Sequence, residues 1–323
     1  MWLWELIRDI FNVQDGERAR QAKRPKRKPL GEGRGVGELA RRLGVTPERL
    51  NALEARYHEF RIPKRRGGSR KILAPDKELK DMQRRILRRL LGRLPCHPAA
   101  TGFRPKQSIV ANARPHAGKA VVVRLDIENF FESTKADRVR DYFREIGWGQ
   151  EAAEILTRLC TYKGGLPQGA PTSPYLSNLV NFRLDTRLAK LAGEVQVQDP
   201  RTGQIRPPGS VAYTRYADDM TFSFDTDDPT GIRCLIRSAK AVIEEEGYKL
   251  HQDRKLQIRR RHDAQVVTGL VVNVAPNLSR KKRRWLRAVE HHVAKGKPAT
   301  LSPPQLKGWQ AFRTMVNSQR TSG

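Results

Sequence analysis

The sequence predicts an α+β fold, in which antiparallel strand pairs and helices occupy separate stretches of the chain. Two observations carry this prediction. Residues 215–224 read RYADDMTFSF, where apolar and polar side chains alternate after two aspartates, as in a half-buried strand that leaves a tight turn. Residues 60–76 hold two short alternating runs on either side of a Gly-Gly pair, which is typical of a hairpin. Amphipathic stretches with helical spacing surround both hairpins.

The other elements can be predicted in chain order. Residues 1–11 are amphipathic and residues 14–36 are a basic stretch with Pro and Gly, which reads as a linker or arm. Thr46 and Pro47 are placed to cap and begin the second of two short helices within 36–57. Further helices are expected over residues 77–94, 135–160, 172–192 and 232–250, and from residue 277 onwards; further strands are expected at 121–125, 255–260 and 264–273.

The composition indicates a folded protein with a polyanionic partner. The 323 residues include 63 Lys and Arg against 34 Asp and Glu, a formal net charge of +29. An excess of this size most often reflects binding to nucleic acid. The three cysteines form no CxxC pair, which argues against a zinc ribbon or a disulfide framework and fits the cytoplasm. No apolar run approaches the ~20 residues of a membrane span, so we expect no membrane partner.

Three aspartates are candidate metal ligands. Asp126 ends the buried strand at 121–125, and Asp218 with Asp219 lies at the predicted turn of the 211–224 hairpin. Carboxylates brought together bind hard divalent cations, and two such ions ~4 Å apart can promote displacement at phosphorus. The alternative is that Asp218 and Asp219 only form a turn, where aspartate is common.

Four motifs resemble those of reverse transcriptases, and they occur in the family's order. They are IPKRRGGSRKILAPD at 62–76, LDIENFF at 125–131, GLPQGAPTSPYLSN at 165–178 and YADD at 216–219. The resemblance implies a right-hand polymerase, with fingers, a palm built on an antiparallel sheet and a helical thumb. It also implies that Asp126, Asp218 and Asp219 are catalytic and hold two Mg²⁺ ions together with Ile127, with Mn²⁺ able to substitute.

The resemblance further implies a nucleotide pocket that receives dNTPs. Lys64 and Arg70 would neutralise the triphosphate. Phe131 matches the position whose ring excludes a 2′-hydroxyl, although core packing would also explain it. Gln168 would line the pocket beside the new base pair, and the small Ala217 would leave room for the primer end.

Two short segments are similar to signatures of the retron subgroup. NARPH spans Asn112 to His116, and VTG spans residues 267–269. We expect RNA contacts from these segments and from the basic thumb; the residues are Asn112, His116, Thr268, Gly269, Lys281, Lys282, Arg283 and Arg284. The implied division is an N-terminal helix and linker (1–36), fingers with a retron-specific insertion (37–118), a palm with part of the fingers (119–275) and a thumb (276–323).

A retron enzyme would copy a structured noncoding RNA of the msr–msd type. The resemblance implies priming from a guanosine 2′-hydroxyl, a branched RNA–DNA product (msDNA), and a role in antiphage defence with a separate effector protein. Three alternatives stay open: an RNA-dependent RNA polymerase, another bacterial reverse transcriptase such as a group II intron type, and a catalytically silent RNA-binding protein.

Overall fold

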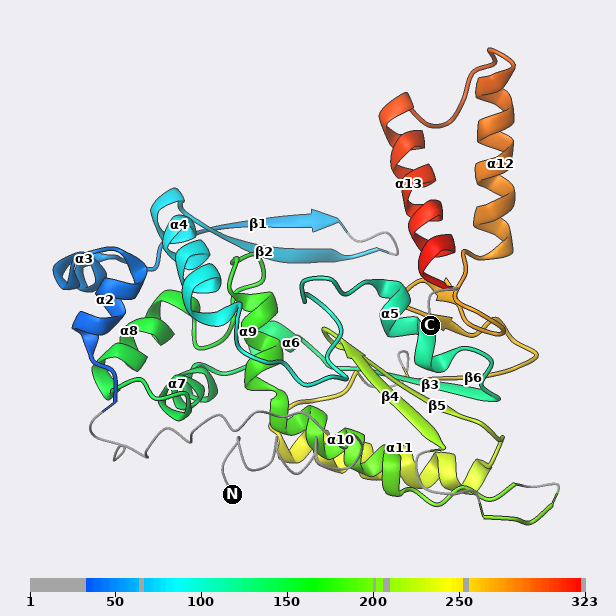
Figure 1. Ribbon diagram of the computed structural model, residues 1–323, viewed down its shortest axis with the longest axis horizontal. Helices are drawn as coiled ribbons and strands as arrows, with labels where there is room; N and C mark the ends of the chain where they lie inside the picture. The colour runs from blue at the N-terminus through cyan, green and yellow to red at the C-terminus, as the bar shows by residue number, and fades with distance from the viewer. Residues whose placement is uncertain (1–32, 64–66, 200–201, 206–209, 252–255, 321–323) are drawn as a thin grey trace, which may run out of the picture.

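A four-stranded antiparallel sheet lies at the centre of the molecule (Figure 1). The computed structural model describes residues 33–63, 67–199, 202–205, 210–251 and 256–320. The sheet has the order β4-β5-β3-β6. Its strands are β3 (Val121–Asp126), β4 (Val211–Tyr216), β5 (Asp219–Phe224) and β6 (Gln257–Arg260). The predicted hairpin over 211–224 is therefore confirmed, as are the strand at 121–125 and the strand that ends at 260.

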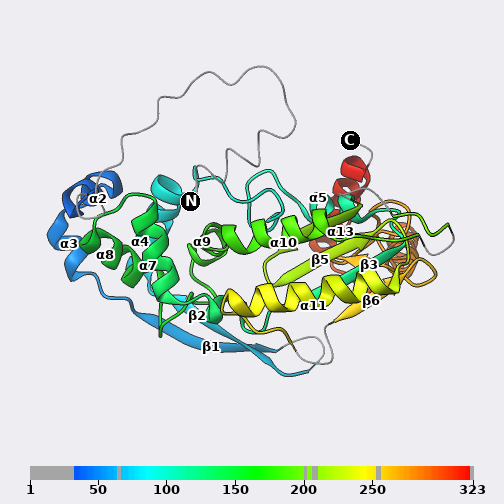
Figure 2. The ribbon, with the colours of Figure 1, turned by 90° about the horizontal axis from the view of Figure 1, so that it is seen from below.

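One face of the sheet is covered by two helices that lie side by side (Figures 1 and 2). They are α10 (Phe182–Glu194) and α11 (Pro229–Glu245). Met220, Phe222 and Phe224 are fully buried against this helical layer, as their alternation predicts. The opposite face of β3 and β5 therefore carries Arg124, Asp126 and Asp219.

A helical lobe stands at the other end of the molecule and has its own core (Figure 1). It contains α2 (Val36–Leu43), α3 (Pro47–Ala52), α4 (Lys77–Ile86), the π-helical η1 (Leu87–Leu91), α7 (Ala136–Glu145), α8 (Gln150–Cys160) and α9 (Ser173–Val180). Thr46 caps α3 by accepting a hydrogen bond from the Arg49 amide, as predicted. The helical stretch predicted at 135–160 is confirmed and consists of two helices, because Gly147 has a φ of 93° and separates α7 from α8.

A long two-stranded hairpin extends from this lobe (Figure 1). Its strands are β1 (Tyr57–Pro63) and β2 (Ser69–Pro75), which confirms the hairpin predicted over 60–76. At its base, the Leu73 amide donates a hydrogen bond to the Gln168 carbonyl at 2.9 Å. A Cβ on Gly169 would lie 2.7 Å from the Leu73 oxygen, so only glycine allows the two backbones to approach this closely.

The C-terminal part of the chain rises as two helices and then returns to the sheet (Figure 1). The two helices are α12 (Arg280–Ala294) and α13 (Pro303–Arg320), and the short β7 (Val266–Val267) and β8 (Leu270–Val271) precede them. Earlier in the chain are the short α5 (Ile109–Ala113) and η2 (Arg114–His116), and α6 (Phe130–Ser133), which follows β3. Val316 of α13 packs against Val110, Val267 and Leu270. The predicted strand at 264–273 is in fact this tight β7–β8 pair. Within the described residues, no helix has both the length and the hydrophobicity needed to cross a bilayer.

Candidate active site

The three aspartates meet at one end of the sheet. Asp126 is the last residue of β3 and pairs directly with Asp219, the first residue of β5. Cross-strand partners in an antiparallel pair project from the same face, with Cα atoms ~5 Å apart. The Ile127 amide donates a hydrogen bond to the Asp218 carbonyl at 3.0 Å, which joins the two chain segments beyond the paired residues. The structure thus brings together Asp126, Ile127, Asp218 and Asp219.

The turn that carries Asp218 has an unusual backbone. Tyr216 pairs with Asp219, which leaves a two-residue loop of Ala217 and Asp218. Ala217 has a φ of 58°, in the region that favours glycine, and its side chain is buried. A positive φ at the first loop residue is what a two-residue hairpin requires. The turn is therefore held in a strained but well-defined conformation.

Two basic side chains approach the carboxylates. The Arg124 guanidinium binds both oxygens of Asp219, with its Nε 3.1 Å from Oδ1. His251 Nε2 lies 3.7 Å from Asp126 Oδ1. Neither Arg124 nor His251 stood out in the sequence as a site residue. A signal existed for Arg124, since it is a charge inside an otherwise apolar strand, two residues before Asp126 and on the same face.

The donor set fits a hard divalent cation, although it is not arranged as a finished metal site. In the part of the chain that the structure describes, no three His, Cys, Asp or Glu side chains are grouped so as to hold a metal ion. The Arg124 contact accounts for this in part, because the guanidinium occupies the Asp219 oxygens. Three carboxylates on two adjacent strand ends still supply the oxygen ligands that Mg²⁺ prefers.

An aromatic group borders the Ala217 turn. Phe131 is half-buried, and its ring centroid lies 5.4 Å from Phe130 and 6.2 Å from Phe103. Phe103 in turn lies 5.7 Å from Tyr216 and is 38% exposed. Sequence reasoning missed Phe103, which stands in an irregular loop with a φ of 61°; an apolar aromatic between Gly and Arg was the only signal. The group places Phe131 close to the strand end that leads to Asp218.

The residues predicted to contact a nucleotide fall into two groups. Gln168 is half-buried and linked to β2 by its backbone, and Arg70 is exposed on β2 opposite Ile62. Lys64 lies outside the described residues. The structure thus joins the Gln168 loop to the base of the hairpin, while the triphosphate role of Lys64 and Arg70 stays a prediction.

His116 lies in the interior, not on an RNA-facing surface. Its side chain is fully buried beneath the sheet face that carries the aspartates. Its Nδ1 is 2.7 Å from the Ser223 hydroxyl and its Nε2 is 2.8 Å from the Thr214 hydroxyl. Burial lowers the pKa of His116 to about 3, so the ring is neutral and bridges β4 and β5. A direct contact with RNA stays a prediction, and this burial weighs against it.

Asn112 is equally buried and links the two retron-like segments. Its Oδ1 accepts a hydrogen bond from the Thr101 hydroxyl at 2.6 Å, and its Nδ2 lies 3.5 Å from the Thr268 hydroxyl. Thr268, with a φ of 44°, and Gly269, with a φ of 83°, form the β7–β8 turn, and the Thr268 hydroxyl donates to the Ile109 carbonyl. The structure therefore brings NARPH and VTG together as one polar joint within the protein.

The basic run at 281–284 forms the first turns of α12. Lys281, Arg283 and Arg284 are exposed, while the Lys282 ammonium lies 5.9 Å from the Trp309 ring centroid. The exposed cations suit phosphate contacts, and Lys282 is partly engaged by cation–π contact within the helix pair.

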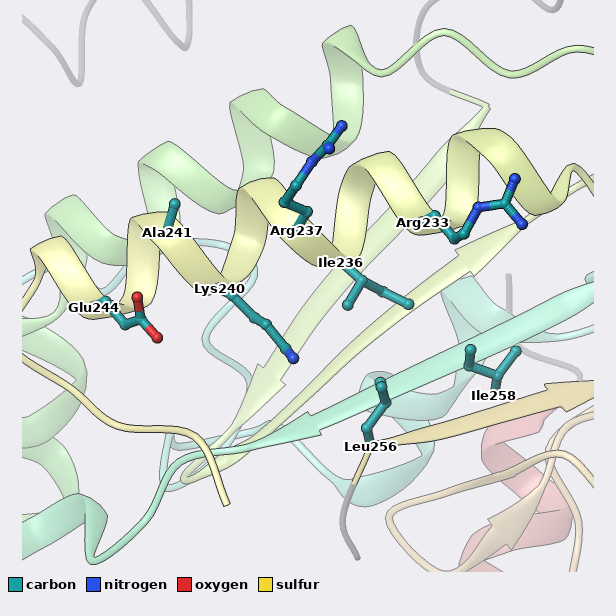
Figure 3. Close-up of a pocket in the computed structure, with 8 residues that line it drawn as sticks. All are labelled: Arg233, Ile236, Arg237, Lys240, Ala241, Glu244, Leu256 and Ile258. Carbon is teal, nitrogen blue, oxygen red and sulfur yellow. The ribbon is translucent and has the colours of Figure 1, made fainter. Parts of the chain in front are cut away.

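Two hollows adjoin the central sheet, and one of them is lined by a candidate metal ligand. One, of about 890 Å³, is lined by Asp126, Glu128 and His251, among others. The other, of about 590 Å³, lies between α11 and β6, with Arg233, Arg237 and Lys240 around Ile236 and Ile258 (Figure 3). The second hollow contains none of the predicted site residues, so the first is the one connected with the carboxylates.

Comparisons with known proteins agree with this site. The family of reverse transcriptases (RNA-dependent DNA polymerases) matches residues 62–286. The retron Mx65 and Mx162 reverse transcriptases of Myxococcus xanthus are 38% and 34% identical to this chain over 82% and 98% of its length. The retron Ec86 reverse transcriptase of Escherichia coli is 32% identical over 87% of this chain.

The alignments also cover much of each relative. This chain spans 62% of the Mx65 protein, 70% of the Mx162 protein and 83% of the Ec86 protein. The family match includes strand β2, all four strands of the central sheet and the three aspartates. The chain therefore belongs to the reverse transcriptases, and within them to the retron type.

Proposed function

We propose that this chain copies a structured noncoding RNA into DNA by metal-assisted nucleotidyl transfer from dNTPs. The observation that carries the proposal is the register that places Asp126 directly opposite Asp219, with Asp218 in the adjoining turn. Three carboxylates at one sheet end have little structural purpose, since like charges in contact repel each other. They have a clear chemical purpose if cations join them.

Asp126, Asp218 and Asp219, with the Ile127 backbone, would hold two Mg²⁺ ions, and Mn²⁺ could replace them. When bound, such ions lower the pKa of the attacking hydroxyl and stabilise charge on the phosphate oxygens. The protein's own contribution is to fix the carboxylates through the strand register and the Ile127 hydrogen bond. Arg124 would keep Asp219 neutralised until a cation takes its place, because it binds both oxygens.

The right-hand division supplies roles for the remaining elements. We assign the helical lobe and the β1–β2 hairpin to the fingers, the central sheet with α10 and α11 to the palm, and α12 with α13 to the thumb. Arg70 and Lys64 would hold the triphosphate, and Gln168, Phe131 and Ala217 would border the nucleotide. Helices α7, α8 and α9 follow β3 in the chain but pack into the helical lobe. The fingers therefore combine a segment that precedes β3 in the sequence with a segment that follows it.

The RNA partner would be of the msr–msd type and would supply both template and primer. A guanosine 2′-hydroxyl of that RNA would begin synthesis, so that the product is msDNA. The exposed cations of α12 would grip phosphates. A separate effector protein and a role in antiphage defence are part of the proposal by similarity to retrons, and the free cysteines suit the cytoplasm.

The test is synthesis on the RNA encoded beside the gene. Purified protein, that RNA, Mg²⁺ and dNTPs should give DNA that stays joined to RNA, and a debranching enzyme should release it as a faster band on a denaturing gel. A product free of RNA would reject the retron priming but leave the polymerase. The absence of any product, with a generic annealed primer extended normally, would reject the RNA partner alone.

A further inference from the structure

Arg215 is a fully buried arginine one step from the candidate metal site. It lies on β4, and its guanidinium forms a two-pronged ion pair with Asp185 of α10, which is also fully buried. Nε is 2.7 Å from Oδ1 and Nη2 is 2.6 Å from Oδ2. The Tyr213 hydroxyl donates a further hydrogen bond to Asp185 at 2.9 Å. Asp185 is therefore well satisfied, and the pair joins the sheet to the helical layer.

The third arm of the guanidinium reaches the aspartate turn. Arg215 Nη1 donates a hydrogen bond to the Ala217 carbonyl at 3.1 Å. That carbonyl belongs to the peptide between Ala217 and Asp218, so its direction sets the orientation of the Asp218 backbone. Ala217 is the residue with the positive φ, and a strained conformation persists only where its surroundings hold it.

Arg215 is itself fixed from several sides. Its amide donates to the Ala99 carbonyl at 2.7 Å, and its carbonyl accepts from the Thr101 amide at 3.0 Å. The guanidinium also lies 5.5 Å from the Phe130 ring centroid. Burial lowers the pKa of Arg215, but the Asp185 carboxylate more than offsets this and holds it above its usual value. The group is thus a permanent cation with one fixed geometry.

Stability alone does not account for this pair. A buried ion pair loses much of its hydration, and well-packed apolar residues of similar size often replace such a pair without loss of stability. Apolar residues could not, however, donate a hydrogen bond to the Ala217 carbonyl. The feature that requires an arginine is the link between the ion pair and the turn.

We infer that Arg215, oriented by Asp185, is a positioning residue that clamps the Ala217–Asp218 peptide and so sets the placement of Asp218 and Asp219 opposite Asp126. This inference rests on the proposed role of the three aspartates as metal ligands. Arg215 does not touch the substrate or the cations. Its effect is on how well the carboxylates are prearranged, and small displacements at a reacting centre have large effects on rate.

The test replaces the ion pair with apolar residues of similar size. The double variant Arg215→Met, Asp185→Leu should melt within a few degrees of the wild type, because both buried charges are removed together. Its kcat for primer extension should fall on the order of a hundredfold, and half-maximal activity should need more Mg²⁺. The dissociation constant for the template–primer should not change. A control makes the same replacements at Arg260 and Asp227, a half-exposed ion pair. Arg260 pairs with Val121, at the end of β3 opposite to Asp126, so this variant tests the loss of an ion pair away from the Ala217 turn.

A second variant covers the case in which the double variant does not fold. Arg215→Lys keeps a cation beside Asp185. A lysine ammonium lacks the planar guanidinium, so it cannot donate two hydrogen bonds to Asp185 and a third to the Ala217 carbonyl in the same fixed geometry. It should fold, and it should show the same increased Mg²⁺ requirement. A folded variant of either kind with wild-type kcat and Mg²⁺ dependence would overturn the inference. Asp218→Asn, assayed in parallel, distinguishes a failure of the Arg215 inference from a failure of the proposed function. If Asp218→Asn remains active, the assignment of the aspartates as metal ligands itself fails.

Discussion

Phe131 owes its position to neighbours on both sides. Phe130, next to it in the chain, is buried in the sheet core, whereas Phe131 is half-buried and contacts Phe103. The Phe131 ring is therefore held by two aromatic neighbours and keeps part of its surface exposed. A steric filter for the sugar requires a ring that is held in this way, since a ring that moved freely could not exclude a hydroxyl.

We predict that Phe131→Val raises ribonucleotide incorporation relative to deoxynucleotide by roughly tenfold to a hundredfold, because a smaller side chain leaves room for the 2′-hydroxyl. Single-nucleotide extension with matched dNTP and rNTP measures the ratio. Phe130→Leu is the control, since it weakens packing without opening the sugar side. If both variants keep the wild-type ratio, Phe131 serves only the core.

His116 makes the stability depend on pH. In the unfolded chain it takes up a proton below about pH 6.5, whereas in the fold burial, and to a lesser extent the nearby Lys119, lowers its pKa to about 3. The unfolded state therefore binds more protons between these values, and the free energy of unfolding should fall as the pH falls from 6.5 toward 3. The slope from this group is at most about 1.4 kcal/mol per pH unit.

His116→Gln should remove that component. Urea unfolding of both proteins between pH 7.5 and 4.5 measures it, because all other titrating groups cancel in the difference. The gap between the two curves should narrow as the pH falls. Parallel curves would show that His116 has the same pKa in the folded and the unfolded state, contrary to the effect of its burial.

The sequence predicts the aspartates but not the groups around them. Asp126, Asp218 and Asp219 are adjacent to elements with strong periodicity, so their meeting follows once the strands pair. Arg124 and Arg215 each act through a side-chain geometry that depends on long-range contacts. Asn112 and His116 were predicted as RNA contacts because they lie in a retron-like segment and offer hydrogen-bond donors and acceptors. In this fold, buried hydroxyl groups of the protein are the partners of both side chains.

At the scale of elements, the main finding is a joint that anchors the end of helix α13 to α5 and to the β7–β8 pair. Helix α13 returns to the sheet and packs on α5 and on the β7–β8 pair. The Arg114 guanidinium donates to the Gln319 carbonyl, and Asn112 links α5 to the β7–β8 turn. The NARPH and VTG segments therefore hold the C-terminal end of α13, the helix that we propose as part of the thumb.

Loss of the joint should affect synthesis on every template. We predict that Asn112→Ala lowers the free energy of unfolding by about 1–3 kcal/mol, because the Thr101 hydroxyl loses its buried partner. Extension of a generic primer should fall along with msDNA formation. Asn317→Ala, on the exposed face of α13, is the control and should change neither. Loss confined to the cognate RNA, in a protein of unchanged stability, would instead support direct RNA recognition by Asn112.

Element prediction succeeded where the pattern is local and failed where tertiary contacts decide. The hairpins, the basic helices after residue 277 and the α3 cap follow from alternation, spacing and capping residues. The break between α7 and α8 depends on Gly147 and on the adjacent Arg34 segment, whose amide bonds to the Gly147 carbonyl. The π-helical stretch at Leu87–Leu91 has no recognisable sequence signal, because it continues the helical spacing of α4.

At the scale of the whole molecule, charge is distributed between two sides of the sheet. Lys281, Arg283 and Arg284 belong to α12, which rises on the side of the sheet away from α10 and α11, whereas Arg233 and Arg237 lie on α11 (Figures 1 and 3). The net charge of +29 includes both groups. Only cations on the aspartate side can contact a template–primer that occupies the active site.

Replacing Lys281, Lys282, Arg283 and Arg284 with Ala should therefore weaken RNA binding and reduce the steepness of its salt dependence. In a plot of the log of the association constant against the log of the salt concentration, the slope is negative. Its magnitude should decrease by roughly 3, because each phosphate contact releases close to one counterion. The double variant Arg233→Ala, Arg237→Ala changes cations that line only the other hollow and should keep the wild-type slope. Equal slopes for all three proteins would contradict a phosphate grip by α12.

The most direct test of the two-metal proposal is primer extension by Asp218→Asn under single-turnover conditions. The account predicts no detectable extension at any Mg²⁺ concentration, because one ligand charge is lost, while the dissociation constant for the RNA stays within about threefold, since the cationic surface is intact. Asp225→Asn, on the same hairpin but paired with Lys119, should extend normally. Near-normal DNA synthesis by Asp218→Asn would contradict the assignment of the aspartates as metal ligands.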